Sequence, residues 1–152
     1  MAITYLGLGT NIGNKRRNLI TAAALLAERV GDVLALSGFY ETEPWGFESN
    51  NWFLNAAVKL NTDYTPQELL VVTQQIEKEL GRTEKSNGTY HDRVIDIDIL
   101  LYDDEVLQTP ELVLPHPLMH ERKFVMEPLA EIAPFVQHPI FKESIMDLNE
   151  RL

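Results

Sequence analysis

The order in which strand-like and helix-like segments follow one another constrains the fold of this chain more than any other sequence feature. Short, dense apolar segments at residues 2–9, 33–40, 52–60 and 94–102 predict strands. The first two and the last two strands are each separated by a stretch with helical spacing of apolar residues. The predicted order β-α-β-β-α-β is typical of a ferredoxin-like α+β fold. We therefore expect an antiparallel sheet with both helices packed on one face.

The second predicted helix has the clearest boundaries in the sequence. Thr65 and Glu68 match a capping box, Pro66 stands at the first helical position, and Gly81 is a natural stop. The apolar positions expected to face the core are Leu19, Ala23, Leu26 and Val30 in the first helix and Leu69, Val72, Ile76 and Leu80 in the second.

After the fourth strand the chain contains proline-rich connections and two short stretches with helical character. We expect helices near 128–133 and 142–150, which would form a C-terminal helical appendage. No internal repeat, low-complexity run or linker interrupts the sequence. A length of 152 residues is sufficient to bury a core, so we expect a single domain over residues 1–152.

The charge balance and cysteine content exclude several classes of function. Thirteen basic against 23 acidic residues give a net charge of −10, which repels nucleic acid and anionic membranes, so neither is expected as a partner. Without cysteine the chain has no disulfide and no thiolate metal site. The basic run 15–17 follows the apolar N-terminal stretch, whereas a secretory signal has it first. We expect a cytoplasmic protein that is monomeric by default.

A glycine-rich segment follows the first strand and superficially resembles a dinucleotide-binding turn. The spacing from Gly9 to Gly13 is four residues instead of three, and no acidic residue ends the second strand. We therefore favour a tight strand-to-helix turn over residues 7–13. The P-loop pattern is also missing from the sequence.

The triplet Asp96-Ile97-Asp98 lies in the fourth predicted strand. Side chains two residues apart on a strand share a face, so both carboxylates project together and Ile97 points the other way. Carboxylates this close repel one another unless a proton or a cation lies between them. The pair is thus either a Mg²⁺ site or an acidic, solvated strand edge, and the triplet alone leaves both possibilities open.

Basic residues on either side of this triplet favour the binding of an anion. Arg82, Lys85 and Arg93 precede it, and Arg122 and Lys123 follow it, close in sequence to His116 and His120. Carboxylates beside guanidinium groups are suited to hold Mg²⁺ together with a polyphosphate. Each arginine taken singly is most often a surface residue without a role, and His116 is equally compatible with a structural and a functional role. Two histidines without cysteine do not favour zinc.

Aromatic residues are concentrated in the loop before the third strand. Trp45, Phe47, Trp52 and Phe53 fall within nine positions, followed by Asn55 inside the strand. The rings either pack at the base of the loop or form a slot for a flat heterocycle. An asparagine inside a strand needs buried hydrogen-bond partners or a ligand, which gives some support to the slot.

Several segments occur together in the order typical of a known family. They are Gly9-Thr10-Asn11, Thr42-x-Pro44, Phe53-Leu54-Asn55-Ala56-Ala57, Gly81-Arg82, Arg93-x-x-Asp96-Ile97-Asp98-Ile99 and Leu114-Pro115-His116-Pro117. On these residues the chain resembles the 6-hydroxymethyl-7,8-dihydropterin pyrophosphokinases of folate biosynthesis along essentially its whole length. The resemblance implies an enzyme that transfers pyrophosphate from ATP to the hydroxymethyl group of the pterin and releases AMP.

The resemblance also implies roles for individual residues. Two Mg²⁺ ions would be held by Asp96 and Asp98, which with Arg82 and Arg93 would form the catalytic group. The ATP-binding residues would be Gln74, Arg82, Arg93, Ile99, His116 and Arg122. The pterin-binding residues would be Thr42, Pro44, Trp45, Phe53, Asn55 and Phe124, with the ring stacked between Phe53 and Phe124. The segments 43–51 and 82–92 would be lids over the substrates.

Departures from the family pattern concern the lids and the nucleotide. Glu84 and Glu111 stand where some members have basic residues, and Tyr90 stands where tryptophan is frequent. Two other readings remain distinct from the kinase. A non-catalytic ferredoxin-like ligand-binding module would bind its ligand without a divalent cation. A nucleotidyl transferase using the same carboxylates would release pyrophosphate instead of AMP.

Overall fold

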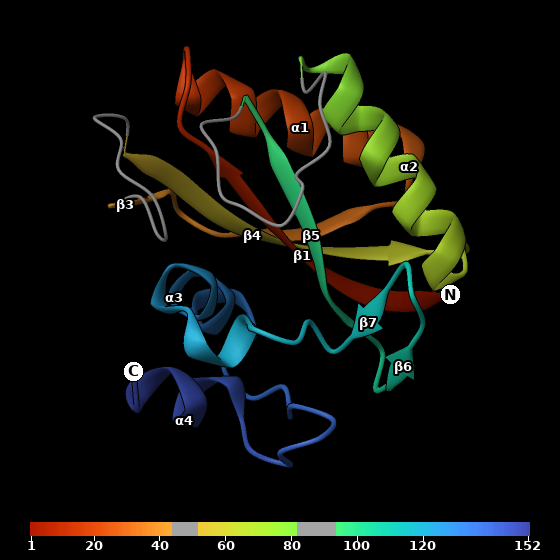
Figure 1. Cartoon of the computed structure of the whole chain (residues 1–152), viewed down its shortest axis with the longest axis vertical. Helices are drawn as coiled ribbons and strands as arrows, with labels where there is room; N and C mark the ends of the chain where they lie inside the picture. The colour runs from red at the N-terminus through yellow and green to blue at the C-terminus, as the bar shows by residue number, and fades with distance from the viewer. Residues whose placement is uncertain (44–51, 82–93) are drawn as a thin grey trace.

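The chain folds around one antiparallel sheet, shown in the computed structural model of Figure 1. The structure describes residues 1–43, 52–81 and 94–152. Within them the sheet has the strand order β2-β4-β1-β5, with β3 paired to β4, and every pairing is antiparallel. The strands are β1 (Ala2–Thr10), β2 (Val33–Leu36), β3 (Tyr40–Thr42), β4 (Phe53–Thr62) and β5 (Asp96–Tyr102). This arrangement confirms the predicted ferredoxin-like α+β fold.

Two helices cover one face of the sheet, α1 (Lys15–Arg29) and α2 (Pro66–Glu79). The Asn14 side chain caps α1, and Thr65 with Glu68 forms the predicted capping box of α2. The apolar stripes of both helices pack onto the sheet as predicted. The fully buried side chains of this first core include Leu6, Leu19, Leu26, Val58, Leu60, Leu69, Ile76 and Ile95.

The C-terminal part of the chain covers the opposite face, so the expectation of helices on one face holds only for α1 and α2. This second layer contains the 3₁₀ turn η1 (Met119–Glu121) and the helices α3 (Lys123–Ile132) and α4 (Ile145–Glu150), and Figure 1 shows it below the sheet. It packs against its own core of Tyr5, Ala57, Leu100, Leu101, Met119, Met126, Leu129 and Ile145. A small hairpin, β6 (Leu107–Gln108) with β7 (Val113–Leu114), connects the sheet to this layer.

Two predicted boundaries differ from the structure for local reasons. The strand expected over 33–40 is divided into β2 and β3, because the Ser37 Oγ replaces a backbone acceptor and binds the Ala57 N–H at 2.8 Å. The helix expected near 128–133 already begins at Lys123 and continues through Pro128. Proline has no backbone N–H to donate and is therefore frequent at the first position of a helix. For this reason the sequence predicts a helix that starts at Pro128.

A bulge in β5 lets this strand contribute to both cores. Tyr5 pairs with Leu101 and Leu6 pairs with Ile99, so Leu100 is the additional residue. Consequently Leu100 and Leu101 both pack in the second core, although they are neighbours in sequence. Before the bulge the alternation is regular, and Ile99 belongs to the first core.

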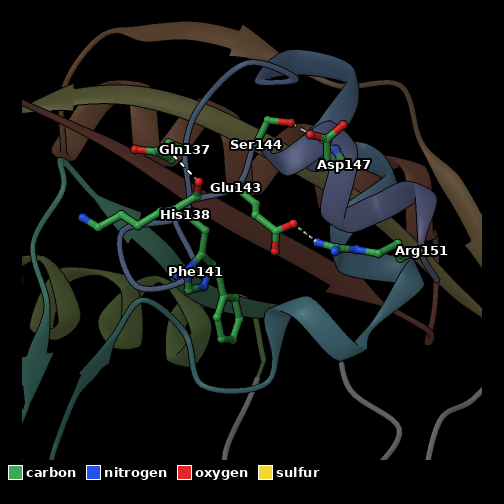
Figure 2. A network of polar contacts seen from close by, with 8 residues as sticks. Gln137, His138, Phe141, Glu143, Ser144, Asp147 and Arg151 are labelled. Atoms are coloured by element: carbon green, nitrogen blue, oxygen red, sulfur yellow. Dashed lines mark hydrogen bonds and ion pairs between the residues drawn. The ribbon is translucent and has the colours of Figure 1, made fainter.

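The segment between α3 and α4 is held by its own hydrogen bonds, and Figure 2 shows that of Gln137 to the Lys142 carbonyl and that of Ser144 with Asp147, together with the ion pair of Glu143 and Arg151. The buried His138 accepts the N–H groups of Ile140 and Phe141 on its Nδ1, at 3.2 and 3.1 Å. Its ring stacks on Phe141, with 4.4 Å between ring centroids. Glu143 forms an ion pair with Arg151 at 2.5 Å. Within the described parts of the chain, no helix combines the length and apolar character that a membrane crossing requires.

Candidate active site

A cavity lies between the sheet and the N-terminal end of α3. Its empty volume is about 580 Å³, including the part open to solvent. The described residues that line it are Gly7, Leu8, Gly9, Thr42, Glu43, Phe53, Asn55, Ala56, Asp96, Asp98, Arg122, Phe124 and Val125. The cavity therefore brings together seven of the predicted site residues, namely Thr42, Phe53, Asn55, Asp96, Asp98, Arg122 and Phe124.

The floor of the cavity is a stretch of sheet without side chains. Gly9 of β1 pairs with Asn55 of β4 on one side and with Asp96 of β5 on the other. Side chains of paired residues project to the same face, so Asn55 and Asp96 flank a bare strand. Neighbouring strands lie about 4.8 Å apart, which puts the backbones of these two residues about 10 Å from each other.

This floor corrects the interpretation of the glycine-rich segment as one continuous turn. Gly7 and Gly9 are inside β1, and only Gly13, with a φ of 75°, occupies the turn before α1. A Cβ added at Gly9 would lie 3.2 Å from the Asn55 Oδ1 and 3.7 Å from the ring of Phe53. The two strand glycines thus leave room for the cavity, and neither has a backbone conformation that requires glycine.

Near Gly9 the cavity presents an amide and an aromatic ring, those of Asn55 and Phe53. Asn55 is buried, and its Nδ2 donates to the Thr42 Oγ1 at 2.8 Å, which fixes the orientation of the amide. Phe53 and Phe124 line the cavity from β4 and α3. Trp52, the alternative candidate for packing at the loop base, is 42% exposed. The aromatic residues in the described part of this loop therefore favour the slot over simple core packing.

On the other side of Gly9 the cavity presents the paired carboxylates. Asp96 and Asp98 are half-buried and line the cavity, whereas Ile97 and Ile99 are buried in the first core, as the strand alternation predicts. The described residues contain no group of three or more histidine or acidic side chains that could hold a metal by themselves. Mg²⁺ typically takes one or two protein carboxylates and completes its shell with water and substrate phosphates, so a pair of carboxylates fits this ion.

A buried arginine, Arg122, also lines the cavity. Arg122 is 6% exposed and stands at the N-terminal cap position of α3. Its guanidinium carbon lies 5.8 Å from the centroid of the Phe124 ring, a cation–π geometry. Burial lowers the pKa of the Arg122 guanidinium, yet arginine remains protonated in proteins. The lining of the cavity thus includes a permanent positive charge in addition to the two carboxylates.

His116 does not line the cavity but lies near its acidic end. Burial lowers the pKa of the His116 imidazole, and the charge of Asp96 acts in the opposite direction. Its Nδ1 accepts the Leu118 N–H at 3.2 Å, so the neutral ring carries its proton on Nε2. This nitrogen is the one that can donate to an anionic oxygen.

Two further predicted residues lie outside the cavity. Gln74 is exposed on α2, and the Ile99 side chain is buried in the first core. The N–H of Ile97 donates to the Glu77 carboxylate at 2.8 Å, on the side of β5 away from β1. Because strand backbone groups two residues apart face the same way, the Ile99 backbone also faces this outer edge. Outside the described residues lie Pro44, Trp45, Arg82 and Arg93. The same holds for both predicted lids, with the exception of Glu43.

Sequence reasoning missed one buried acid at the edge of the site. Glu77 is 5% exposed on α2, and its hydrogen bond to Ile97 fixes the strand between the two aspartates. An acidic residue on the apolar face of the predicted helix was the available signal, because a buried carboxylate requires a partner. Glycines at alternate positions of a strand were the corresponding signal for the cavity floor.

Comparisons with known proteins identify relatives of this chain. Residues 5–134 match the family described as 7,8-dihydro-6-hydroxymethylpterin-pyrophosphokinase (HPPK). The 2-amino-4-hydroxy-6-hydroxymethyldihydropteridine pyrophosphokinase of Porphyromonas gingivalis is 57% identical over 141 residues, covering 91% of this chain and 95% of that protein. The enzyme of the same name from Aquifex aeolicus is 43% identical over 149 residues, covering 98% and 91%.

A solved structure shows the same fold at low sequence identity. The wild-type HPPK-DHPS of Plasmodium falciparum, crystallised with pteroate, superimposes with a TM-score of 0.79 at 17% identity. The match covers 99% of this chain but only 44% of that longer chain. Taken together, the motifs, the cavity and these relatives establish that the chain belongs to the 7,8-dihydro-6-hydroxymethylpterin-pyrophosphokinase family, whose members transfer a pyrophosphoryl group from ATP to 6-hydroxymethyl-7,8-dihydropterin in folate synthesis.

Proposed function

We propose that the cavity between β1, β4, β5 and α3 is the place where this chain carries out pyrophosphoryl transfer. The single observation that carries the proposal is that one cavity has an oriented amide at one end and two carboxylates at the other, separated by a bare glycine strand. The pterin would occupy the amide end and the triphosphate the acidic end. The hydroxymethyl group of the pterin would then point along the floor of the cavity toward the phosphates.

The amide end is suited to a flat, polar heterocycle. The Asn55 Nδ2 donates to the Thr42 Oγ1 at 2.8 Å and to the Tyr40 carbonyl at 3.5 Å, so the Asn55 carbonyl would be the atom that accepts from a ring edge carrying a donor. The pterin ring has such an edge. Phe53 and Phe124 would stack on its faces, and Pro44 and Trp45 would complete the slot from the segment beyond Glu43.

The acidic end would hold Mg²⁺ through Asp96 and Asp98, with two ions expected. When bound, Mg²⁺ would neutralise phosphate charge and polarise the attacking hydroxyl and the phosphoryl group. The protein positions the two carboxylates on one strand face, and Glu77 fixes the backbone between them. The nearby Arg122 would contribute a charge that persists at every working pH.

The nucleotide would extend from the carboxylates along the outer edge of β5. There the backbone of Ile99 and the Nε2 of His116 would contact ATP, and Gln74 would approach it from the exposed side of α2. Arg82 and Arg93 would supply further positive charge at the phosphates. Phosphoryl-type transfer requires mainly in-line positioning and charge neutralisation, which is what these groups can provide.

We further propose that residues 1–152 form one pyrophosphokinase domain that acts as a monomer in the cytoplasm, where ATP is available. Two cores on opposite faces of one sheet support the single domain. Sedimentation analysis at micromolar concentration would show a species of 17.4 kDa, and a dimer would contradict the proposed monomer.

The decisive experiment is incubation with Mg-ATP and 6-hydroxymethyl-7,8-dihydropterin, followed by chromatography of the products. We expect AMP and pterin diphosphate, and no product when EDTA is added in excess. Release of pyrophosphate would instead indicate nucleotidyl transfer. Ligand binding without any turnover would indicate a non-catalytic module.

The same assay separates the proposed roles of the arginines. The Arg93→Ala variant should slow the transfer by more than it weakens ATP binding, because its charge would act mainly in the transition state. Equal losses in rate and affinity would instead assign Arg93 to ground-state anchoring of ATP.

A further inference from the structure

A carboxylate on α3 contacts the junction between β2 and β3. Both oxygens of Glu131 accept the Gly38 N–H at 3.1 Å, and its Oε1 accepts the Tyr40 hydroxyl at 2.5 Å. Gly38 and Tyr40 belong to the edge of the sheet, whereas Glu131 belongs to the layer below it. These bonds therefore cross between the two layers that enclose the cavity.

Both partners in this contact share a face with residues of the amide end. Phe124 and Glu131 are seven residues apart in α3, which puts them on one side of the helix. Tyr40 and Thr42 are two residues apart in β3 and project to the same face of the sheet. The helix side that presents Phe124 to the cavity is thus bonded to the strand face that presents Thr42.

Among the described residues, β3 is held, besides by Glu131, through its pairing with β4 and through the Asn55 amide, which donates to the Thr42 Oγ1 and to the Tyr40 carbonyl. It is three residues long and pairs there with β4 alone. The insertion of Ser37 into the ladder separates it from β2, so β3 does not share the continuous pairing of that strand. A short edge strand of this kind relies on contacts outside the ladder to keep its position.

We infer that Glu131 is a positioning residue for the pterin end of the cavity. Through Tyr40 and Gly38 it holds β3 against α3 and so sets the separation between the Thr42–Asn55 pair and the ring of Phe124. The inference rests on the proposed placement of the pterin between these groups. Glu131 itself does not line the cavity, so it acts through β3 and not by touching the substrate.

The Tyr40 hydroxyl keeps its proton at neutral pH. The hydrogen bond to Glu131, together with partial burial, raises the pKa of Tyr40 to about 12, so its hydroxyl remains a donor. Hydrogen bonds to a carboxylate are stronger than those between neutral groups. Glu127, one turn before Glu131 in α3, adds negative charge near Tyr40.

The test compares Glu131→Ala, Glu131→Gln and Tyr40→Phe for pterin affinity, ATP affinity and kcat. We expect the KM for the pterin to rise about tenfold in Glu131→Ala and about threefold in Tyr40→Phe, with the KM for ATP unchanged. Glu131→Gln retains one carbonyl acceptor and should recover part of the loss. The dissociation constant of the oxidised, fluorescent pterin should change in parallel, which gives a readout independent of turnover.

A double variant provides the sharpest criterion. Because Tyr40 and Glu131 act through the same bond, Tyr40→Phe combined with Glu131→Ala should be no worse than Glu131→Ala alone. Two variants serve as controls. Glu127→Gln removes a charge from the same side of α3 without a bond to β3, and Glu143→Gln weakens the ion pair with Arg151 shown in Figure 2. Neither should alter the pterin KM.

The possible outcomes separate this inference from the proposed function. Equal increases in the KM values for pterin and ATP, additive effects in the double variant, or an equal effect of Glu127→Gln would each overturn the role of Glu131. The wild-type enzyme would still form AMP in those cases. A wild type that binds no pterin would overturn the proposed site, and the inference with it.

Discussion

The two faces of the same sheet differ in how completely they are filled. On β1, Leu6 and Leu8 point to the α1–α2 face and are buried in its core. Gly7 and Gly9 alternate with them and point to the other face, where the cavity lies. β1 therefore contributes large apolar side chains to one face and leaves space on the other at Gly7 and Gly9.

The strand β5 repeats this division with polar residues. Ile97 and Ile99 fill the closed face, whereas Asp96 and Asp98 face the cavity. Past the bulge, Leu100 and Leu101 close the remaining part of the open face against α3 and α4. The comparison teaches that a two-residue period can separate the residues that stabilise the fold from those that bind ligand, because adjacent positions on a strand point to opposite faces.

The largest effect is expected for the carboxylates of the open face. Asp98→Ala should reduce kcat by about 10³-fold or more, because the phosphates and Mg²⁺ lose a charged ligand. The free energy of unfolding should stay near the wild-type value, since Asp98 is half-buried beside a second acid. Product analysis and chemical denaturation measure the two quantities.

An acidic residue at the far end of β5 supplies the control. Asp104→Ala removes an exposed carboxylate just beyond this strand and should leave both kcat and stability unchanged. Near-normal turnover in Asp98→Ala would contradict the assignment of the metal site to this face.

On the closed face we expect the reverse pattern. Leu6→Ala should lower the free energy of unfolding by about 2–5 kcal/mol, because it leaves a cavity in a fully buried core. The KM values of the folded variant should match those of the wild type. Denaturant titration and steady-state kinetics would check this, and a selective loss of pterin affinity would show that the two faces are coupled.

A smaller effect is expected when the open face is partly filled. Gly9→Ala should raise the pterin KM about tenfold, because its Cβ would lie 3.2 Å from the Asn55 Oδ1 and displace the amide. Gly7→Ala is the matched variant on the same strand face, and its Cβ would meet Leu100 at an ordinary 3.5 Å. Kinetics with varied pterin should therefore show a clear loss for Gly9→Ala and a minor one for Gly7→Ala. Equal losses would argue against a specific role of Asn55.

The smallest effect concerns the C-terminal layer and pH. Burial, with a minor contribution from His120, lowers the pKa of His138 below its usual 6.5. His138 therefore binds a proton more readily in the unfolded chain than in the folded one. The contribution of the neutral His138 to the free energy of unfolding is complete above pH 6.5 and is lost as the pH falls below this value. His116 acts in the same direction, because burial also lowers its pKa.

His138→Asn separates these two contributions. The Asn Oδ1 can accept the N–H groups of Ile140 and Phe141 in place of the imidazole nitrogen, but it does not titrate. Urea titrations between pH 7.5 and pH 5 should show a shallower decline of the unfolding free energy than in the wild type. An unchanged slope would mean that other groups, His116 among them, account for the acid sensitivity.

Strand alternation made part of the candidate site predictable. The common face of Asp96 and Asp98 follows from a period of two residues, and the cap of α2 follows from Thr65 and Glu68. The partner of Asn55 could not be read locally, because Thr42 reaches it across a strand pairing thirteen residues away. The start of α3 could not be predicted from the local sequence either, because Pro128 resembles the first residue of a helix although α3 begins at Lys123 and continues through it.

The amino-acid sequence by itself determined the order of strands and helices, the shared face of the two acids and the resemblance to pterin pyrophosphokinases. These depend on periodicity and on short motifs, which act between residues close in the chain. Only the tertiary structure decided that glycines of β1 lie beneath the space between Asn55 and Asp96, that α3 covers the second face, and that Glu131 bonds to β3. These relations join residues tens of positions apart, and strand pairing and layer packing bring them together.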